Sequence, residues 1–125
     1  MKILCGTDII EISRIKKSIE KLGERFTDLI YTPEEKAYCE SKRQAKYIHY
    51  AGRFAAKEAI YKAISSLLKD RFGVSWKDVQ VINDKNGNPH VEFRGIELKQ
   101  IDDIDISISH CKEYAVATAI ISIKE

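Results

Sequence analysis

Apolar side chains recur at helical spacing in the first half of the chain and alternate with polar ones near its end. An apolar residue at every third or fourth position from Ile12 to Leu22, with Gly23 as a stop signal, predicts a helix. Residues 2–9 before it are expected to form a strand. A further helical turn is expected at residues 26–30, packed on the core.

Two more helices are predicted before the middle of the chain. Residues 32–35, TPEE, are typical of a helix start: Thr32 can cap, proline suits the first turn, and Glu35 can complete a capping box. This helix is expected to end near Ser41. A longer helix, rich in alanine, lysine, glutamate and leucine, is expected from about Gln44 to Lys69.

The last third of the chain predicts antiparallel strands. Residues 79–82 and 90–93 are short apolar runs, and Asn86-Gly87 between them is a turn signal. Residues 104–109 alternate isoleucine with aspartate and serine, which predicts a half-buried strand, and residues 114–123 predict a final one. A strand, several helices and then four strands indicate an α+β fold, with an antiparallel sheet packed against helices.

Composition indicates one soluble domain over residues 1–125. Hydrophobic residues make up 44% and charged residues 32%, which is ordinary for a globular protein. No apolar run could cross a bilayer, and the start is too soon charged for a secretion signal, so we expect a cytoplasmic protein without a membrane partner. The net charge of +2 gives no support for nucleic acid as a partner. The three cysteines are expected to be free thiols.

Positive charge gathers on one predicted helix and the turn after it. The basic residues there are Arg14, Lys16, Lys17, Lys21 and Arg25, against only Glu20 and Glu24. A basic helix face suits an acidic partner. From charge alone, a solvated helix face is the more ordinary explanation.

The predicted long helix carries the sharpest chemical signal. At 100° per residue, Glu58 and Lys62 lie on one face with Ala51 and Ala55, whose small side chains let a ligand or another backbone approach. Charges on such a surface need partners. An ion pair between Glu58 and Lys62 explains them about as well as a functional site does.

Asp8 favours the functional explanation. It stands at the end of an otherwise apolar strand, where aspartate is disfavoured. It could cap the helix that follows, or it could deliver a carboxylate to a cleft between strand and helix. If Glu58 faces the same cleft, the two carboxylates predict a magnesium site that substrate phosphates and water complete. Lys62 would then be placed to meet a phosphate.

Other polar residues give weaker signals. Arg53 and Lys57 lie roughly opposite Glu58, so they are expected to be solvated, structural or turned toward a neighbouring subunit. His110 ends a strand, and a lone histidine is more often structural than catalytic. The turn at residues 85–89 could offer backbone groups to a ligand, but a simple hairpin explains it locally.

Four motifs, in order along the chain, resemble one family. Residues 54–62, FAAKEAIYK, resemble the Phe-x-x-Lys-Glu-Ala-x-x-Lys signature of phosphopantetheinyl transferases. Residues 6–9, GTDI, with Arg14 resemble the opening Gly-x-Asp motif of the holo-acyl-carrier-protein synthase branch. Residues 108–115, ISHCKEYA, resemble its Ser-His-x-x-x-Tyr-Ala stretch, and the turn NGNP at residues 86–89 also matches. Together the motifs cover essentially the whole chain.

The resemblance implies a fold and an activity. The fold would be that of 4′-phosphopantetheinyl transferases. The activity would be magnesium-dependent transfer of 4′-phosphopantetheine from coenzyme A to a serine of an apo acyl carrier protein, in fatty acid biosynthesis. The family's short members are homotrimers with active sites between subunits. Two alternatives are a non-catalytic coenzyme A-binding module and a structural domain in which Glu58 and Lys62 form an ion pair and Asp8 caps a helix.

The resemblance also implies roles for single residues. Asp8 and Glu58 would bind the metal and, with Lys62 on the pyrophosphate, form the catalytic set. The proton of the attacking serine would go to a carboxylate such as Glu58 or to a water on the metal. Coenzyme would be bound by Arg53, Lys62, Asn86, Gly87, Pro89 and His110. The acidic helix of the carrier protein would dock on Arg14, Lys17, Lys21 and Arg25.

One segment departs from the family pattern. Members of the family often carry a glycine-rich loop after the signature lysine, whereas residues 63–68 contain no glycine. Close approach of the backbone to the coenzyme is expected to be harder here. Thr7 stands where the family usually has an aliphatic residue, and we expect this difference to matter little.

Overall fold

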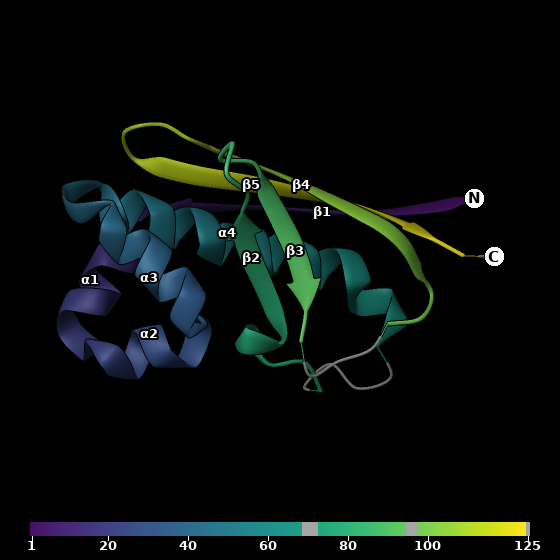
Figure 1. The fold of residues 1–125 in the computed structure, drawn as a ribbon, viewed down its shortest axis with the longest axis horizontal. Coiled ribbons are helices and arrows are strands. Elements are labelled where there is room, and N and C mark those ends of the chain that lie inside the picture. The colour runs from purple at the N-terminus through teal and green to yellow at the C-terminus, as the bar shows by residue number, and fades with distance from the viewer. Residues whose placement is uncertain (69–72, 95–97, 125) are drawn as a thin grey trace.

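A computed structural model describes residues 1–68, 73–94 and 98–124. The chain forms the following elements: β1 (Lys2–Glu11), α1 (Ile12–Leu22), α2 (Glu24–Ile30), α3 (Pro33–Ser41), α4 (Lys46–Ile64), β2 (Val79–Asn83), β3 (Pro89–Phe93), β4 (Ile101–His110) and β5 (Tyr114–Ile123). Short 3₁₀ turns occur at Arg43–Ala45, Ser65–Leu67 and Trp76–Asp78. The predicted α+β order is confirmed, and the expected turn at residues 26–30 is the helix α2 (Figure 1).

Local signals placed most helix ends correctly. Gly23 ends α1 with a positive φ of 58°, and its N–H donates to the Ile19 carbonyl at 2.7 Å. Thr32 and Glu35 form the expected capping box at the start of α3. The long helix is shorter than expected, because the chain tightens into a 3₁₀ turn after Ile64. The predicted end at Lys69 lies outside the described residues.

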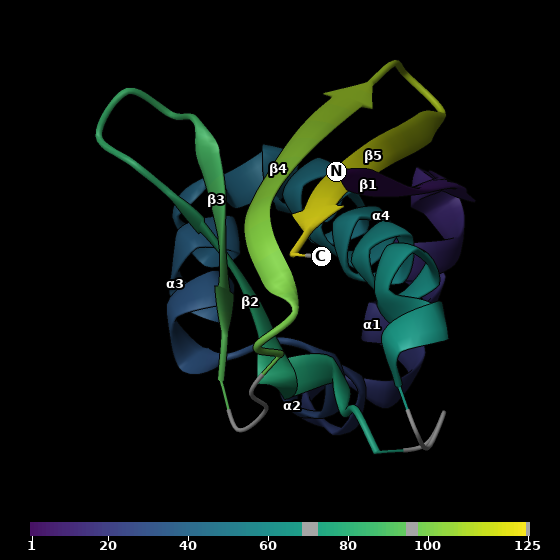
Figure 2. The same cartoon turned by 90° about the vertical axis from the view of Figure 1, so that its right-hand side faces the viewer.

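Two antiparallel sheets lie around α4, where the sequence predicted one. The first has the strand order β1-β5-β4, and the second is the hairpin β2-β3. Figure 2 shows α4 beside the three-stranded sheet, with the hairpin next to β4. Helices α1–α3 gather at one end of the molecule (Figure 1). No helix in the described part of the chain is long and apolar enough to span a membrane.

Helix α4 is buried on several sides, which explains its many small residues. Ala51, Ala55, Ala56 and Ala59 are fully buried, and larger side chains such as Ile60 fill the space toward the sheets. A helix packed between two sheets needs small side chains wherever a strand comes close. The alanines that the sequence placed near Glu58 therefore form part of the core.

The closest approach between strand and helix is at Gly6. A Cβ atom on Gly6 would lie 2.0 Å from the Ala59 carbonyl oxygen and 2.9 Å from the Ala63 nitrogen. Both contacts are with the backbone of α4, so a side chain at this position can only be accommodated if the helix moves. Only glycine lets β1 and α4 pack at this distance.

We expect Gly6→Ala to destabilise the protein strongly. The added methyl group overpacks a backbone contact, so the free energy of unfolding should fall by about 3 kcal/mol, at the upper end for such changes. Urea unfolding followed by circular dichroism measures it. Gly52→Ala is the matched control, because its Cβ would meet only the side-chain end of Ile108 at 3.1 Å. A fall for Gly6→Ala no larger than for Gly52→Ala would contradict the packing described here.

Candidate active site

Asp8 and Lys62 meet at the contact between β1 and α4. The Lys62 Nζ donates to Asp8 Oδ1 at 3.1 Å and to the Thr7 carbonyl at 3.0 Å. Asp8 is an inward-facing residue of β1, on the same side of the strand as Gly6, and its side chain is mostly buried. Lys62 thus pairs with Asp8 across the two elements. The alternative role for Asp8 as a helix cap is wrong, because Glu11 is the N-cap residue of α1 and no side chain caps it.

Glu58 brings a second carboxylate to the same place. Burial raises the pKa of Glu58, the negative charge of Asp8 raises it further, and Lys62 partly opposes both. Two carboxylates that repel each other in a half-buried site favour a cation between them. The site predicted from Asp8, Glu58 and Lys62 is therefore brought together by the fold.

The two carboxylates of this site suit a magnesium ion that takes its other ligands from water and substrate. No group of three or more histidine, cysteine, aspartate or glutamate side chains could hold a metal within residues 1–68, 73–94 and 98–124. Magnesium is commonly held by one or two carboxylates, with waters and substrate phosphates as its other ligands. Asp8 and Glu58 fit this arrangement.

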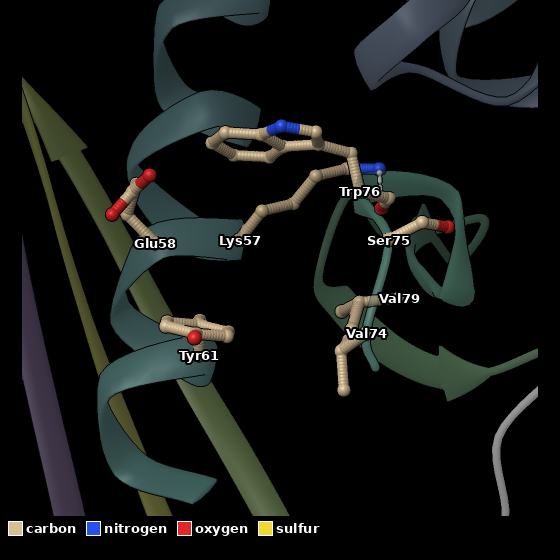
Figure 3. A pocket seen from close by; sticks show the side chains of 7 residues that line it. All are labelled: Lys57, Glu58, Tyr61, Val74, Ser75, Trp76 and Val79. Carbon is tan, nitrogen blue, oxygen red and sulfur yellow. Dashed lines mark hydrogen bonds between the residues drawn. The ribbon is translucent and has the colours of Figure 1, made fainter. Parts of the chain in front are cut away.

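A cavity of about 280 Å³ opens beside Glu58. Figure 3 shows Lys57 reaching from α4 toward the segment that carries Val74, Ser75, Trp76 and Val79, with Glu58 and Tyr61 on the same helix. The Trp76 ring stacks on Phe54 with 5.0 Å between centroids, which fixes one wall. The cavity therefore joins a charged edge at Glu58 to a mostly apolar interior.

Lys57 holds this wall in place from the buried side of α4. Its Nζ lies 2.7 Å from Glu35 Oε1 and donates to the carbonyls of Ile30 and Trp76 at 2.8 and 3.0 Å. Burial lowers the pKa of Lys57, and the Glu35 carboxylate opposes that shift. Glu35 Oε2 also accepts from the Val81 N–H at 2.8 Å. Of the possible roles for Lys57, the structural one is confirmed and the solvated one is wrong.

A second cavity, of about 200 Å³, lies at a different face of α4. The residues that line it include Arg53, His49, His110, Gly87 and Pro89. Arg53 is only 3% exposed, its guanidinium lies 4.1 Å from the centre of the Tyr38 ring, and it donates to Asn83. Arg53 is therefore not solvated either. The fold brings together the coenzyme contacts expected at Arg53, His110, Gly87 and Pro89.

Asn86 is the exception among the expected coenzyme contacts. It lies in the same turn but does not line the cavity, and its backbone N–H donates to Asp84 Oδ1 at 2.9 Å. The Asn88 N–H donates to the same oxygen at 2.9 Å. Asp84 therefore shapes the turn from within, and Asn86 contributes to its conformation.

The basic residues near the start of the chain form one exposed surface. Arg14, Lys17 and Lys21 of α1 and Arg25 of α2 are all exposed. Two apolar side chains also reach solvent there, Leu22 at 40% and Leu29 at 62% exposure. Exposed apolar side chains near charged ones are typical of a protein-binding surface.

Comparison with known proteins decides the family. The model of the 4′-phosphopantetheinyl transferase superfamily matches residues 4–119. The chain belongs to this family. The holo-acyl-carrier-protein synthase of Ruminiclostridium cellulolyticum is 41% identical over 98% of this chain and 94% of its own length. That of Protochlamydia amoebophila is 43% identical over 96% of this chain and 98% of its own.

Solved structures of transferases from this family share the fold. The holo-acyl-carrier-protein synthase of Bacillus anthracis, in complex with coenzyme A, has a TM-score of 0.77 at 35% identity, with 97% of this chain and 96% of that chain covered. The Helicobacter pylori enzyme in complex with coenzyme A has a TM-score of 0.83 at 26% identity, with 95% and 100% covered. The fold expected from the resemblance is confirmed.

Sequence reasoning missed several residues of these cavities. Tyr61, Trp76 and His49 were not singled out, and Glu35, which lines neither cavity but pairs with Lys57, was recognised only as a cap. One signal was present for Glu35: Lys57 lies about 100° around the helix from Glu58 and needed an acidic partner from elsewhere in the chain. Nothing local pointed to Trp76, which reaches α4 only through the tertiary fold.

Glu58→Gln is expected to stabilise the metal-free protein at neutral pH. The pKa of Glu58 is higher in the folded chain than its ordinary value of 4.5, so the folded state holds that proton more tightly. The resulting stability is present below pH 4.5 and is lost as the pH rises through the raised pKa. Scanning calorimetry with chelator should show a higher Tm for Glu58→Gln at pH 7 and little difference at pH 4.

Glu113→Gln serves as the control, because Glu113 is exposed in the turn between β4 and β5. Its Tm should stay close to the wild-type value at pH 7. An equal or lower Tm for Glu58→Gln at pH 7 would mean that the charge of Glu58 is already compensated within the chain.

Proposed function

We propose that this protein is a holo-acyl-carrier-protein synthase. It transfers 4′-phosphopantetheine from coenzyme A to a serine of an apo acyl carrier protein in fatty acid biosynthesis, and it releases adenosine 3′,5′-bisphosphate. The observation that carries the proposal is the cluster of Asp8, Glu58 and Lys62, of which Glu58 also lines a cavity. The similarity to holo-acyl-carrier-protein synthases over nearly the full chain supports it.

Asp8 and Glu58 would hold a magnesium ion in this reaction. When bound, the ion supplies positive charge that neutralises the pyrophosphate of coenzyme A and the charge that develops on its leaving group. The raised pKa of Glu58 supports this assignment, since a cation relieves the repulsion between the two carboxylates.

Lys62 would bind the pyrophosphate as a point charge. Its side chain is half exposed, so it can turn from Asp8 toward a phosphate oxygen. The serine oxygen of the carrier protein attacks the β-phosphorus, the bond to adenosine 3′,5′-bisphosphate breaks, and the serine proton goes to a base. Glu58 and a water at the magnesium site are the two candidates for that base.

The two cavities suit the two ends of coenzyme A. The cavity beside Glu58 has apolar walls at Tyr61, Val74 and Trp76, which suit the pantetheine arm. The second cavity has Arg53 and His110 for a phosphate and the Gly87–Pro89 turn for the adenine. The nucleotide end is therefore assigned to the second cavity.

The positions of these cavities support active sites shared between subunits. Glu58 and Arg53 lie on different faces of α4. We therefore infer that coenzyme bound at Glu58 contacts Arg53 of a neighbouring chain. The outer face of the sheet β1-β5-β4 also exposes apolar residues, with Ile3 at 59%, Ile9 at 63% and Ile120 at 51% exposure. Apolar patches of this kind mark interfaces. We infer a homotrimer that covers this face.

The exposed basic surface of α1 and α2 would dock the carrier protein. Arg14, Lys17, Lys21 and Arg25 would pair with acidic side chains, and Leu22 and Leu29 would pack against apolar ones. Complementary charge speeds the encounter of two proteins and orients them. We expect the reaction in the cytoplasm, as the sequence predicted.

The proposed activity is tested by weighing the carrier protein. The protein is mixed with coenzyme A, magnesium and an apo acyl carrier protein, and mass spectrometry should show the gain of one phosphopantetheine group. Chelator should stop the gain, and magnesium should restore it. Glu58→Gln should slow transfer by on the order of 10²-fold or more, because it removes a metal ligand and a candidate base.

Two outcomes would contradict the proposal. If none of several carrier proteins gained the group, the transferase activity would be wrong, and coenzyme binding without magnesium would then favour a non-catalytic binding module. If Glu58→Gln kept full activity with magnesium present, the metal site would be wrong. The Glu113→Gln variant should transfer at the wild-type rate.

A further inference from the structure

His49 occupies the second cavity without a role in the function proposed above. It lies on α4, one turn before Arg53, and it lines the cavity together with Arg53 and His110. Its ring is half buried and contacts the Tyr38 ring edge-on, with 5.6 Å between centroids. The aromatic contact restricts the imidazole to a position at the cavity wall.

Within the described part of the chain, the groups recorded as interacting with the charge of His49 are all basic. They are Arg53 on α4, Lys42 at the end of α3 and His110 at the end of β4, and the phenol of Tyr38 on α3 completes the surroundings. No carboxylate is among the described residues that line the cavity. Burial, and then the charges of Arg53, Lys42 and His110, lower the pKa of His49, so its free ring is mainly neutral at pH 7.

Arg53 gives an independent sign of a ligand. Its side chain is 3% exposed, and its Nε is buried without a hydrogen-bond partner. A buried donor that lacks an acceptor is costly unless something supplies one. Arg53 lines the cavity together with His49 and His110, so an anion bound there would lie against a guanidinium that still has an unused donor.

We infer that His49 binds the 3′-phosphate of coenzyme A as an imidazolium, and that the ring takes up a proton from solvent when the phosphate enters the cavity. This inference rests on the proposed function. A phosphate carries about −1.5 to −2 charges at pH 7, so it brings negative charge next to His49, where the neighbouring groups are basic. Its negative charge favours the protonated ring, whose N–H then donates to a phosphate oxygen. Wild-type affinity for coenzyme A should therefore rise as the pH falls through the neutral range.

Isothermal titration calorimetry of the full-length protein separates this role from a structural one. Coenzyme A and dephospho-coenzyme A, which lacks the 3′-phosphate, are titrated at pH 7 in two buffers with different ionisation enthalpies. The difference in heat between the buffers gives the number of protons taken up. Wild type is compared with His49→Gln, which cannot be protonated, and with His49→Lys, which carries a permanent charge.

We expect His49→Gln to bind coenzyme A about tenfold more weakly, the effect of losing one charge-assisted hydrogen bond, and to take up fewer protons than wild type. Its affinity for dephospho-coenzyme A should stay within about twofold of wild type, since that ligand lacks the phosphate. His49→Lys should restore the preference for coenzyme A without the proton uptake, because its ammonium is already charged.

Other results would overturn the inference. Equal proton uptake by wild type and His49→Gln, or equal weakening of both ligands, would reduce His49 to a structural residue while leaving the proposed function intact. If wild type bound coenzyme A no better than dephospho-coenzyme A yet still modified the carrier protein, the phosphate assignment alone would be wrong. If wild type neither bound coenzyme A nor modified any carrier protein, the proposed function and this inference would fail together.

Discussion

The backbone contact between β1 and α4 at Gly6 determines the geometry of the site. Gly6 lets the strand approach the Ala59 carbonyl, and Ala59 follows Glu58 directly in the helix. Side chains two residues apart point to the same face of a strand, so Asp8 faces α4 as Gly6 does. The close packing of β1 on α4 therefore explains the Gly-x-Asp motif. The glycine brings the helix close, and the aspartate meets Lys62 and Glu58 at that distance.

The polar residues of the buried helix α4 have distinct roles. Lys57 ties the helix to α3 and β2 through Glu35 and holds the backbone of Trp76. Lys62 pairs with Asp8 of β1, Glu58 lines the cavity beside Trp76, and Arg53 lines the second cavity. Both cavities are thus built on one helix, but different segments of the chain form their other walls. Under the proposed function, we infer that a second copy of the chain completes each site.

Local sequence patterns predicted much of the fold, for physical reasons. Periodicity and capping depend on neighbours a few residues apart, so the start of α3 at Thr32, the end of α1 at Gly23 and the strand β5 all followed from the sequence. The helix wheel also grouped Glu58 with Lys62 and separated Arg53 and Lys57. The split into two sheets, the Glu35–Lys57 pair and the Trp76 wall depend on contacts between distant segments. No local pattern encodes those contacts.

Complementation between inactive subunits tests the shared site most directly. Glu58→Gln removes the metal site of its own chain, and His110→Glu places a negative charge in the phosphate cavity at an exposed position. Each variant alone should be inactive at limiting coenzyme A. When the two are co-expressed in equal amounts and purified as mixed trimers, about a quarter of the sites should combine an intact Glu58 with an intact His110 from a neighbour. Recovery of about a quarter of the wild-type rate is the predicted result. A mixture no more active than either parent would show that each chain builds its site alone.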